Sequence, residues 1–133
     1  MDKKKILIVD DEVDMLSLLE TRLSAAGYSV IKAADGKEGL RLAKKEQPDM
    51  IILDIMMPGL GGDKVAEILK SEPDTRQIPI IFLTCLYTKE EESSQGHRIE
   101  GNFFIAKPFD QKELLSEIKN RLNNKKIAFG DDF

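Results

Sequence analysis

The sequence predicts a doubly wound α/β domain, in which helices cover both faces of a five-stranded parallel sheet. Three observations lead to this fold class. Short apolar runs of strand length recur along the chain, with segments of helical spacing between most of them. The run at residues 50–53 contains no polar residue, which is typical of a central strand buried on both faces. Several runs end on carboxylates or other polar side chains, at the edge where such sheets bind ligands.

The five expected strands are short runs rich in apolar and β-branched residues. They lie at residues 5–9, 28–33, 50–53, 79–84 and 102–107. Because helices are expected between them, the sheet should be parallel, with right-handed crossovers. The flavodoxin-like strand order 2-1-3-4-5 then puts the first and third strands side by side.

The first three helices are expected from apolar spacing and from residues typical of helix ends. The first runs up to Gly27, a good residue just past a helix C-terminus. Asp35 and Glu38 form a capping-box pattern that opens the second. The third follows Gly62 and must stop at Pro73.

The last two expected helices differ in how well they can pack. Residues 89–98 should form a helix by alternation, but they offer no apolar residue to pack inward, so we expect it to be weak or shortened. The last helix, capped by Asp110, has a clear apolar face that ends at Leu122. The expected domain spans residues 4–124, followed by a C-terminal tail at 125–133.

Length, charge and cysteine count limit which partners and which cellular compartment we expect. A chain of 133 residues fits one domain. Its net charge of −4 and pI near 5.1 lack the basic face that nucleic acid requires, so we expect no direct nucleic acid binding. The sequence contains no signal peptide or membrane span. Cys85 is the only cysteine and cannot form an internal disulfide, which suits a cytoplasmic protein.

Polar side chains gather at one expected edge of the sheet. Asp10 and Asp11 follow the first strand and Asp54 follows the third, its neighbour. Thr84 ends the fourth strand and Lys107 ends the fifth. Three carboxylates this close repel one another, and Mg²⁺ would relieve them because it prefers oxygen ligands. With Asp54 as nucleophile and Lys107 neutralising phosphoryl oxygens, these groups fit a phosphoryl-transfer site.

Each of these residues also has an ordinary structural explanation. Asp10 and Asp11 could cap the first helix, and Asp54 could start a turn. Thr84 suits a strand end, and Lys107 suits a solvated surface. The placement of all five at one edge favours the functional interpretation.

Four segments together resemble the receiver domain of bacterial two-component response regulators. They are Ile-Leu-Ile-Val-Asp10-Asp11-Glu12, Ile-Ile-Leu-Asp54-Ile-Met-Met-Pro58-Gly, Ile-Phe-Leu-Thr84 and Phe104-Ile-Ala-Lys107-Pro108-Phe109. Each stands at a strand end of the α/β pattern, and the resemblance extends from about Lys4 to Leu122.

The resemblance implies that Asp54 accepts a phosphoryl group from a phosphohistidine. The donor would be a sensor histidine kinase or a histidine phosphotransfer protein. The resemblance also implies Mg²⁺ as the cofactor, held by Asp11, Asp54 and the backbone carbonyl of Met56, with Asp10 helping through water.

The same resemblance implies a switch rather than an enzyme that turns over a free substrate, although such a domain assists its own phosphorylation and dephosphorylation. Thr84 would bond the phosphoryl group, and Lys107 would pair with it. Phe104 would turn inward as Thr84 shifts. The changed surface would regulate a downstream partner, and the resemblance also allows a dimer that forms on phosphorylation.

Other functions on the same fold are disfavoured by particular residues. A flavin mononucleotide site needs a hydroxyl- and amide-rich loop after the first strand, where Asp10-Asp11-Glu12 would repel phosphate. The Gly-x-x-x-x-Gly-Lys-Ser/Thr string of nucleoside triphosphatases is absent from the sequence. A phosphatase with an aspartate nucleophile would usually carry Asp-x-Asp after the first strand and an added cap domain, and the sequence shows neither. A binding module that has lost phosphorylation is disfavoured by the intact set Asp11, Asp54, Thr84 and Lys107.

Two features leave the output of the domain open. Glu100-Gly101 stands where the family commonly has Gly-Ala, and the helix expected before it is unusually polar. These segments belong to the family's usual output face. No effector domain follows Leu122 in the sequence, so both a stand-alone receiver and a piece of a longer regulator remain open.

Overall fold

The strands form one sheet whose order matches the predicted topology. The computed structural model describes residues 3–84, 98–99, 102–106 and 110–131. Its strands are β1 (Lys5–Val9), β2 (Ser29–Ala33), β3 (Met50–Leu53), β4 (Ile80–Thr84), β5 (Arg98–Ile99) and β6 (Asn102–Ala106). They lie in the order β2-β1-β3-β4-β6-β5. All pairs except β5 with β6 are parallel, so the expected order 2-1-3-4-5 is confirmed, with β6 as the expected fifth strand.

One short strand was not predicted. Strand β5 pairs antiparallel with β6, with Arg98 opposite Phe103 and Ile99 opposite Asn102. The expected helix over residues 89–98 is therefore wrong at Arg98, and residues 89–97 lie outside the described part of the chain. The edge strand β6 would otherwise present unpaired N–H and C=O groups, and the two residues of β5 satisfy some of them. The sheet thus gains a sixth strand at its edge.

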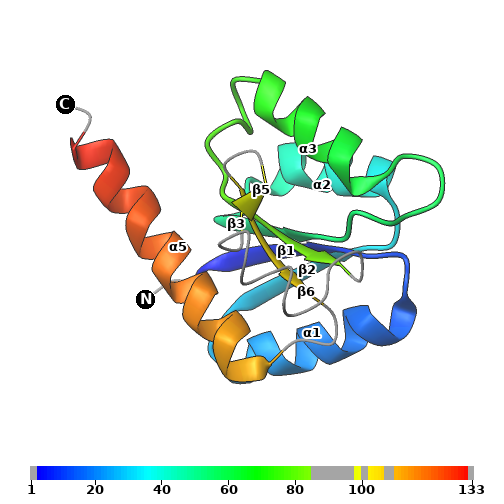
Figure 1. Cartoon of the computed structure of the whole chain (residues 1–133), viewed down its shortest axis with the longest axis horizontal. Helices are drawn as coiled ribbons and strands as arrows, with labels where there is room; N and C mark the ends of the chain where they lie inside the picture. The colour runs from blue at the N-terminus through cyan, green and yellow to red at the C-terminus, as the bar shows by residue number, and fades with distance from the viewer. Residues whose placement is uncertain (1–2, 85–97, 100–101, 107–109, 132–133) are drawn as a thin grey trace.

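The described helices cover both faces of the sheet. They are α1 (Val13–Ala25), α2 (Gly36–Glu46), α3 (Gly62–Ser71) and α5 (Gln111–Asp131). Helices α1 and α5 lie on one face, and α2 and α3 lie on the other (Figure 1). The doubly wound fold class is confirmed by this arrangement.

Side chains of the central strands alternate between two apolar clusters. In β1, Ile6 and Ile8 pack with residues of α1 and α5, whereas Leu7 and Val9 pack with residues of α2 and α3. Strand β3 is buried along its whole length. This agrees with the prediction that a strand without polar residues lies at the centre of the sheet. The buried strands hold the residues that follow them at a fixed edge.

Helix α5 is longer than the sequence analysis expected. Its described residues that pack against the sheet include Leu114, Ile118 and Leu122, which belong to the predicted apolar face. The helix nevertheless continues to Asp131, and its C-terminal part projects away from the sheet (Figure 1). Residues 125–131, assigned from the sequence to a tail, are thus helical. Apart from Gly130, they are residues that a helix tolerates well, and they include no proline.

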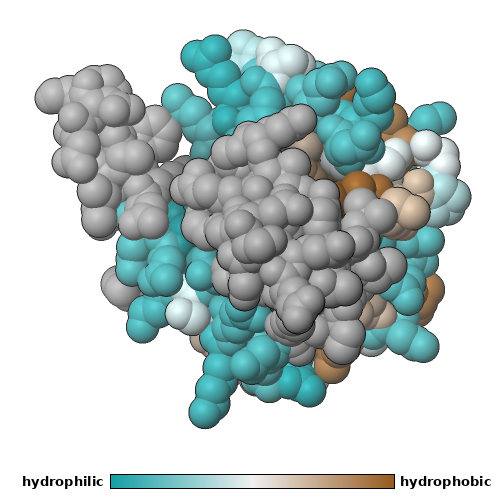
Figure 2. Space-filling model, viewed as in Figure 1, coloured by the Kyte–Doolittle hydropathy of each residue, from teal (hydrophilic) through white to brown (hydrophobic). Residues whose placement is uncertain are grey.

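The described surface is mostly hydrophilic in the view of Figure 2, with small hydrophobic areas. Among the described residues, the large hydrophobic side chains that remain exposed are Val13, Leu18 and Met56. No described helix combines the length and the apolar character that a membrane span needs.

Helix ends follow the predicted signals. Gly27, just past the end of α1, has a φ of 98°, a conformation that glycine adopts without steric cost. Asp35 is the N-cap of α2, and its Oδ1 accepts a hydrogen bond of 2.9 Å from the backbone N–H of Glu38. Helix α2 ends at Glu46, shortly before Pro48.

Replacing Asp35 by alanine is expected to lower the free energy of unfolding by about 1 kcal/mol, because an N–H at the start of α2 loses its partner. Urea denaturation measures this loss. Asp35→Asn is the matched control, since asparagine caps helices about as well as aspartate. Equal stability of the alanine and asparagine variants would show that the cap does not contribute.

Candidate functional site

Asp10 and Asp54 lie next to each other because they follow paired residues of neighbouring strands. Val9, the last residue of β1, is the register partner of Leu53, the last residue of β3. The backbone N–H of Asp54 donates to the carbonyl of Val9 at 2.9 Å. The N–H of Asp10 donates to the carbonyl of Ala33 at 3.1 Å. The sheet ladder therefore continues into both aspartates and fixes their backbones.

Both aspartate side chains are buried and held by turn hydrogen bonds. Asp10 is 1% exposed and Asp54 is 4% exposed. An Oδ1 atom of Asp10 accepts a bond of 2.9 Å from the backbone N–H of Glu12. The Oδ1 atom of Asp54 accepts a bond of 3.2 Å from the N–H of Met56. Each carboxylate is thus oriented by the residue two positions after it.

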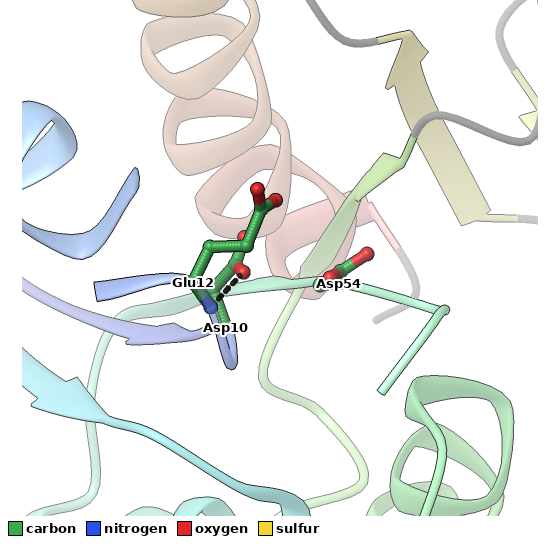
Figure 3. A group of neighbouring side chains, drawn as sticks. All are labelled: Asp10, Glu12 and Asp54. Atoms are coloured by element: carbon green, nitrogen blue, oxygen red, sulfur yellow. Dashed lines mark hydrogen bonds between the residues drawn. The ribbon is translucent and has the colours of Figure 1, made fainter. Parts of the chain in front are cut away.

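Glu12 supplies a third carboxylate at the same place. Carboxylate oxygens of Asp10, Glu12 and Asp54 all lie within 4.8 Å of one another. Figure 3 shows the three side chains together, with Asp10 and Glu12 in the turn after β1 and Asp54 at the end of β3. Asp11, which the resemblance assigned as a direct ligand, is exposed and does not belong to this group. The sequence analysis had noted Glu12 only as part of the acidic turn.

The other expected site residues are placed by the strands as far as the described residues extend. Thr84 is the last residue of β4, and its register partner in β6 is Ala106. Lys107 follows Ala106 in the sequence but lies outside the described residues. Phe104 lies in β6, opposite Phe82 of β4. Met56 is 55% exposed beside Asp54.

Helix α3 begins directly against the backbone of Asp54. The N–H of Gly62 donates to the carbonyl of Ile55 at 3.0 Å. A Cβ atom added at Gly62 would lie 2.1 Å from the carbonyl oxygen of Asp54 and 2.8 Å from Cα of Ile55. Only glycine therefore allows this close approach. The turn that carries Asp54 is confined between β3 and the start of α3.

The chemistry of the cluster is that of a site for a hard cation. All three side chains offer carboxylate oxygens, the donor atoms that Mg²⁺ prefers. Like charges at this separation, two of them buried, destabilise one another unless a cation or a proton compensates. The donor set therefore fits Mg²⁺. A carboxylate held beside such a cation can also act as a nucleophile toward a phosphoryl group.

Comparison with known proteins matches most of the chain to one family. Residues 6–119 match the response regulator receiver domain. A probable transcriptional regulator, ycf27, of Porphyridium aerugineum is 44% identical over 122 residues, which cover 92% of this chain and 49% of that protein. The alkaline phosphatase synthesis transcriptional regulatory protein PhoP of Bacillus subtilis is 39% identical over 127 residues, covering 94% of this chain and 51% of that protein. The chain thus spans about half the length of these relatives.

Solved structures give the same result along nearly the whole chain. A CheY-like response regulator receiver domain protein of Methanospirillum hungatei superposes with a TM-score of 0.81 and is 28% identical, covering 96% of this chain and 99% of that one. The signal receiver domain of a signal transduction histidine kinase of Syntrophus aciditrophicus has a TM-score of 0.77 and 32% identity, covering 91% of each chain.

Proposed function

Because the chain belongs to the family of response regulator receiver domains, we propose that it is a phosphorylation-dependent signalling switch whose phosphoryl acceptor is Asp54. The observation that carries this proposal is the position of Asp54. Its buried carboxylate follows β3, beside the carboxylates of Asp10 and Glu12. A nucleophile among anions needs a cation before a phosphoryl group can approach, and the donor set fits one.

Mg²⁺ would be held by Asp54, by Asp11 and by the backbone carbonyl of Met56, with Asp10 acting through water. When bound, it would neutralise negative charge on the phosphoryl oxygens. Asp11 is exposed and directly follows Asp10 in the turn after β1, which supports a role for it at the ion. The hydrogen bond from the Met56 N–H to Asp54 supports the proposal, because it holds the backbone at position 56 beside the nucleophile.

In the proposed reaction, a carboxylate oxygen of Asp54 attacks the phosphorus of a phosphohistidine on a partner kinase or phosphotransfer protein. The new O–P bond forms as the bond from phosphorus to the histidine nitrogen breaks, with the two atoms roughly in line. Lys107 would pair with the transferred group and Thr84 would donate a hydrogen bond to it. A partner kinase that uses ATP would place the chain in the cytoplasm.

The output would follow from a shift of Thr84 with an inward turn of Phe104. Thr84 ends β4 and Phe104 lies in the middle of β6, the strand that pairs with β4, which supports such coupling. We place the receiver domain at residues 4–124. Relatives about twice as long are named transcriptional regulators, and we propose that this domain likewise controls a downstream partner or segment.

The proposal is tested by incubating the chain with Mg²⁺ and a small acyl phosphate such as acetyl phosphate. Intact-mass spectrometry should then show the addition of one phosphoryl group. A chelator should prevent the addition, because the carboxylate cluster would lack its cation. An unchanged mass in the presence of Mg²⁺ and donor would contradict the proposal.

The lifetime of the phosphorylated state should depend on two side chains. Hydrolysis requires a water molecule in line with the Asp54 oxygen that leaves. Receivers resembling this chain place two residues beside that path, here Met56 and Leu86, and neither can orient a water by hydrogen bonding. We therefore expect slow self-dephosphorylation. Met56→Asn combined with Leu86→Glu should raise the rate of phosphate loss by up to ~10²-fold, the contribution of a positioned acid or base.

The decay is followed by intact mass after removal of the donor. Leu18→Asn is a suitable control, since Leu18 is another exposed hydrophobic residue but lies on α1. A wild-type phosphate lost within seconds, together with no acceleration in the double variant, would show that these side chains do not set the lifetime.

A further inference from the structure

Glu12 is the one carboxylate of the cluster to which the resemblance assigns no role. It is the N-cap residue of α1, yet its side chain makes no capping hydrogen bond to that helix. Instead its carboxylate lies within 4.8 Å of those of Asp10 and Asp54. A glutamate at this position could have stabilised the positive end of the helix by turning toward its N–H groups. Its side chain turns toward two other anions.

The backbone of the turn fixes Glu12 in this position. Its N–H donates to Asp10 Oδ1 at 2.9 Å, so Glu12 cannot move away from Asp10 without breaking a bond to a buried carboxylate. The next residue, Val13, already belongs to α1. Glu12 is thus anchored between the end of β1 and the start of a packed helix. Its own residue is exposed, which leaves room for water beside its carboxylate.

We propose that Glu12 is a metal-positioning residue, whose carboxylate accepts a hydrogen bond from a water on Mg²⁺ and strengthens the binding of the ion beside Asp10 and Asp54. This inference rests on the proposed function and adds a residue to it. Mg²⁺ keeps several waters when it binds to proteins, and such waters need acceptors. The exposed Glu12 carboxylate can supply one, and outer-sphere partners of this kind commonly change metal affinity by 10-fold or more.

The test is a calorimetric titration of the full chain with MgCl₂, without any phosphoryl donor. Glu12→Gln is expected to weaken Mg²⁺ binding about tenfold. Asp14→Asn is the matched control, because Asp14 is also an exposed acid in the first turn of α1 but lies outside the cluster. It should change the affinity much less. Glu12→Asp, which keeps the charge but shortens the side chain, should also weaken binding.

Thermal stability gives a second measurement of the same role, independent of calorimetry. The thermal midpoint of Glu12→Gln is measured first without Mg²⁺ and then with it. Added Mg²⁺ should then raise this midpoint less than it does in the wild type. Asp14→Asn should respond to Mg²⁺ as the wild type does.

The outcomes separate this inference from the proposed function. If the wild type binds Mg²⁺ and Asp54→Asn weakens that binding, but Glu12→Gln behaves like Asp14→Asn, the role of Glu12 is wrong and the proposed function stands. If the wild type neither binds Mg²⁺ nor accepts a phosphoryl group from acetyl phosphate, both are wrong.

Discussion

Replacing Asp54 by asparagine is expected to abolish phosphorylation of this chain. The amide has no anionic oxygen to attack phosphorus, and the neighbouring Asp10 carboxylate is oriented by the Glu12 N–H instead. The change is nearly isosteric and removes a buried negative charge beside two others. The variant should therefore fold like the wild type. Intact-mass spectrometry after incubation with acetyl phosphate and Mg²⁺ measures the loss.

Asp10→Asn is the matched control for this experiment, because Asp10 is equally buried in the same cluster. It should slow the reaction by weakening the cation site but leave the acceptor in place. Labelling that persists in Asp54→Asn and disappears in Asp10→Asn would mean that the acceptor is misassigned.

Gly62→Ala should produce the largest loss of stability among single changes near the site. The added Cβ would meet the carbonyl oxygen of Asp54 at 2.1 Å, and this neighbour is backbone that cannot rotate away. Overpacking commonly costs about 1–3 kcal/mol, and such a close backbone clash should reach or exceed roughly 3 kcal/mol. The turn at Asp54 must also shift, so phosphorylation should slow in the fraction that folds.

Gly27→Ala separates this clash from the general cost of replacing a glycine. No atom lies within 4 Å of a Cβ built at Gly27, but its φ of 98° is unfavourable for alanine. That strain should cost roughly 1–2 kcal/mol. Urea denaturation compares the two variants. A smaller loss for Gly62→Ala than for Gly27→Ala would contradict the close approach of α3 to Asp54.

The sheet could be predicted from the sequence because its strands are buried, and burial on both faces leaves a clear apolar signal in residues 50–53. Strand β5 could not, because two residues carry no periodicity. Gly101, between β5 and β6, favours turns and is the one local signal that could have indicated a break before β6. The length of α5 was missed because the apolar face in the sequence ends at Leu122, and the prediction ended the helix where that face ends.

The carboxylate cluster could be predicted only in part, because strand patterns place backbones but not side chains in turns. Strand ends placed Asp10 and Asp54 correctly, because the parallel register aligns residues that follow paired positions. Glu12 was missed as a member of the cluster, since the direction of a side chain in a turn depends on local hydrogen bonds that strand patterns do not reveal. Three consecutive acids in one turn are a signal that more than one of them reaches the site.

Identification of the modified residue in the wild-type chain tests the central claim most directly. The chain is phosphorylated with acetyl phosphate and Mg²⁺ and then treated with borohydride, which reduces an aspartyl phosphate to homoserine. Peptide mass spectrometry locates the change. We predict homoserine at position 54 and at no other position. Homoserine at position 10 or 11, or unmodified aspartate at position 54 in a chain that has gained a phosphoryl group, would contradict the assignment of Asp54 as the acceptor.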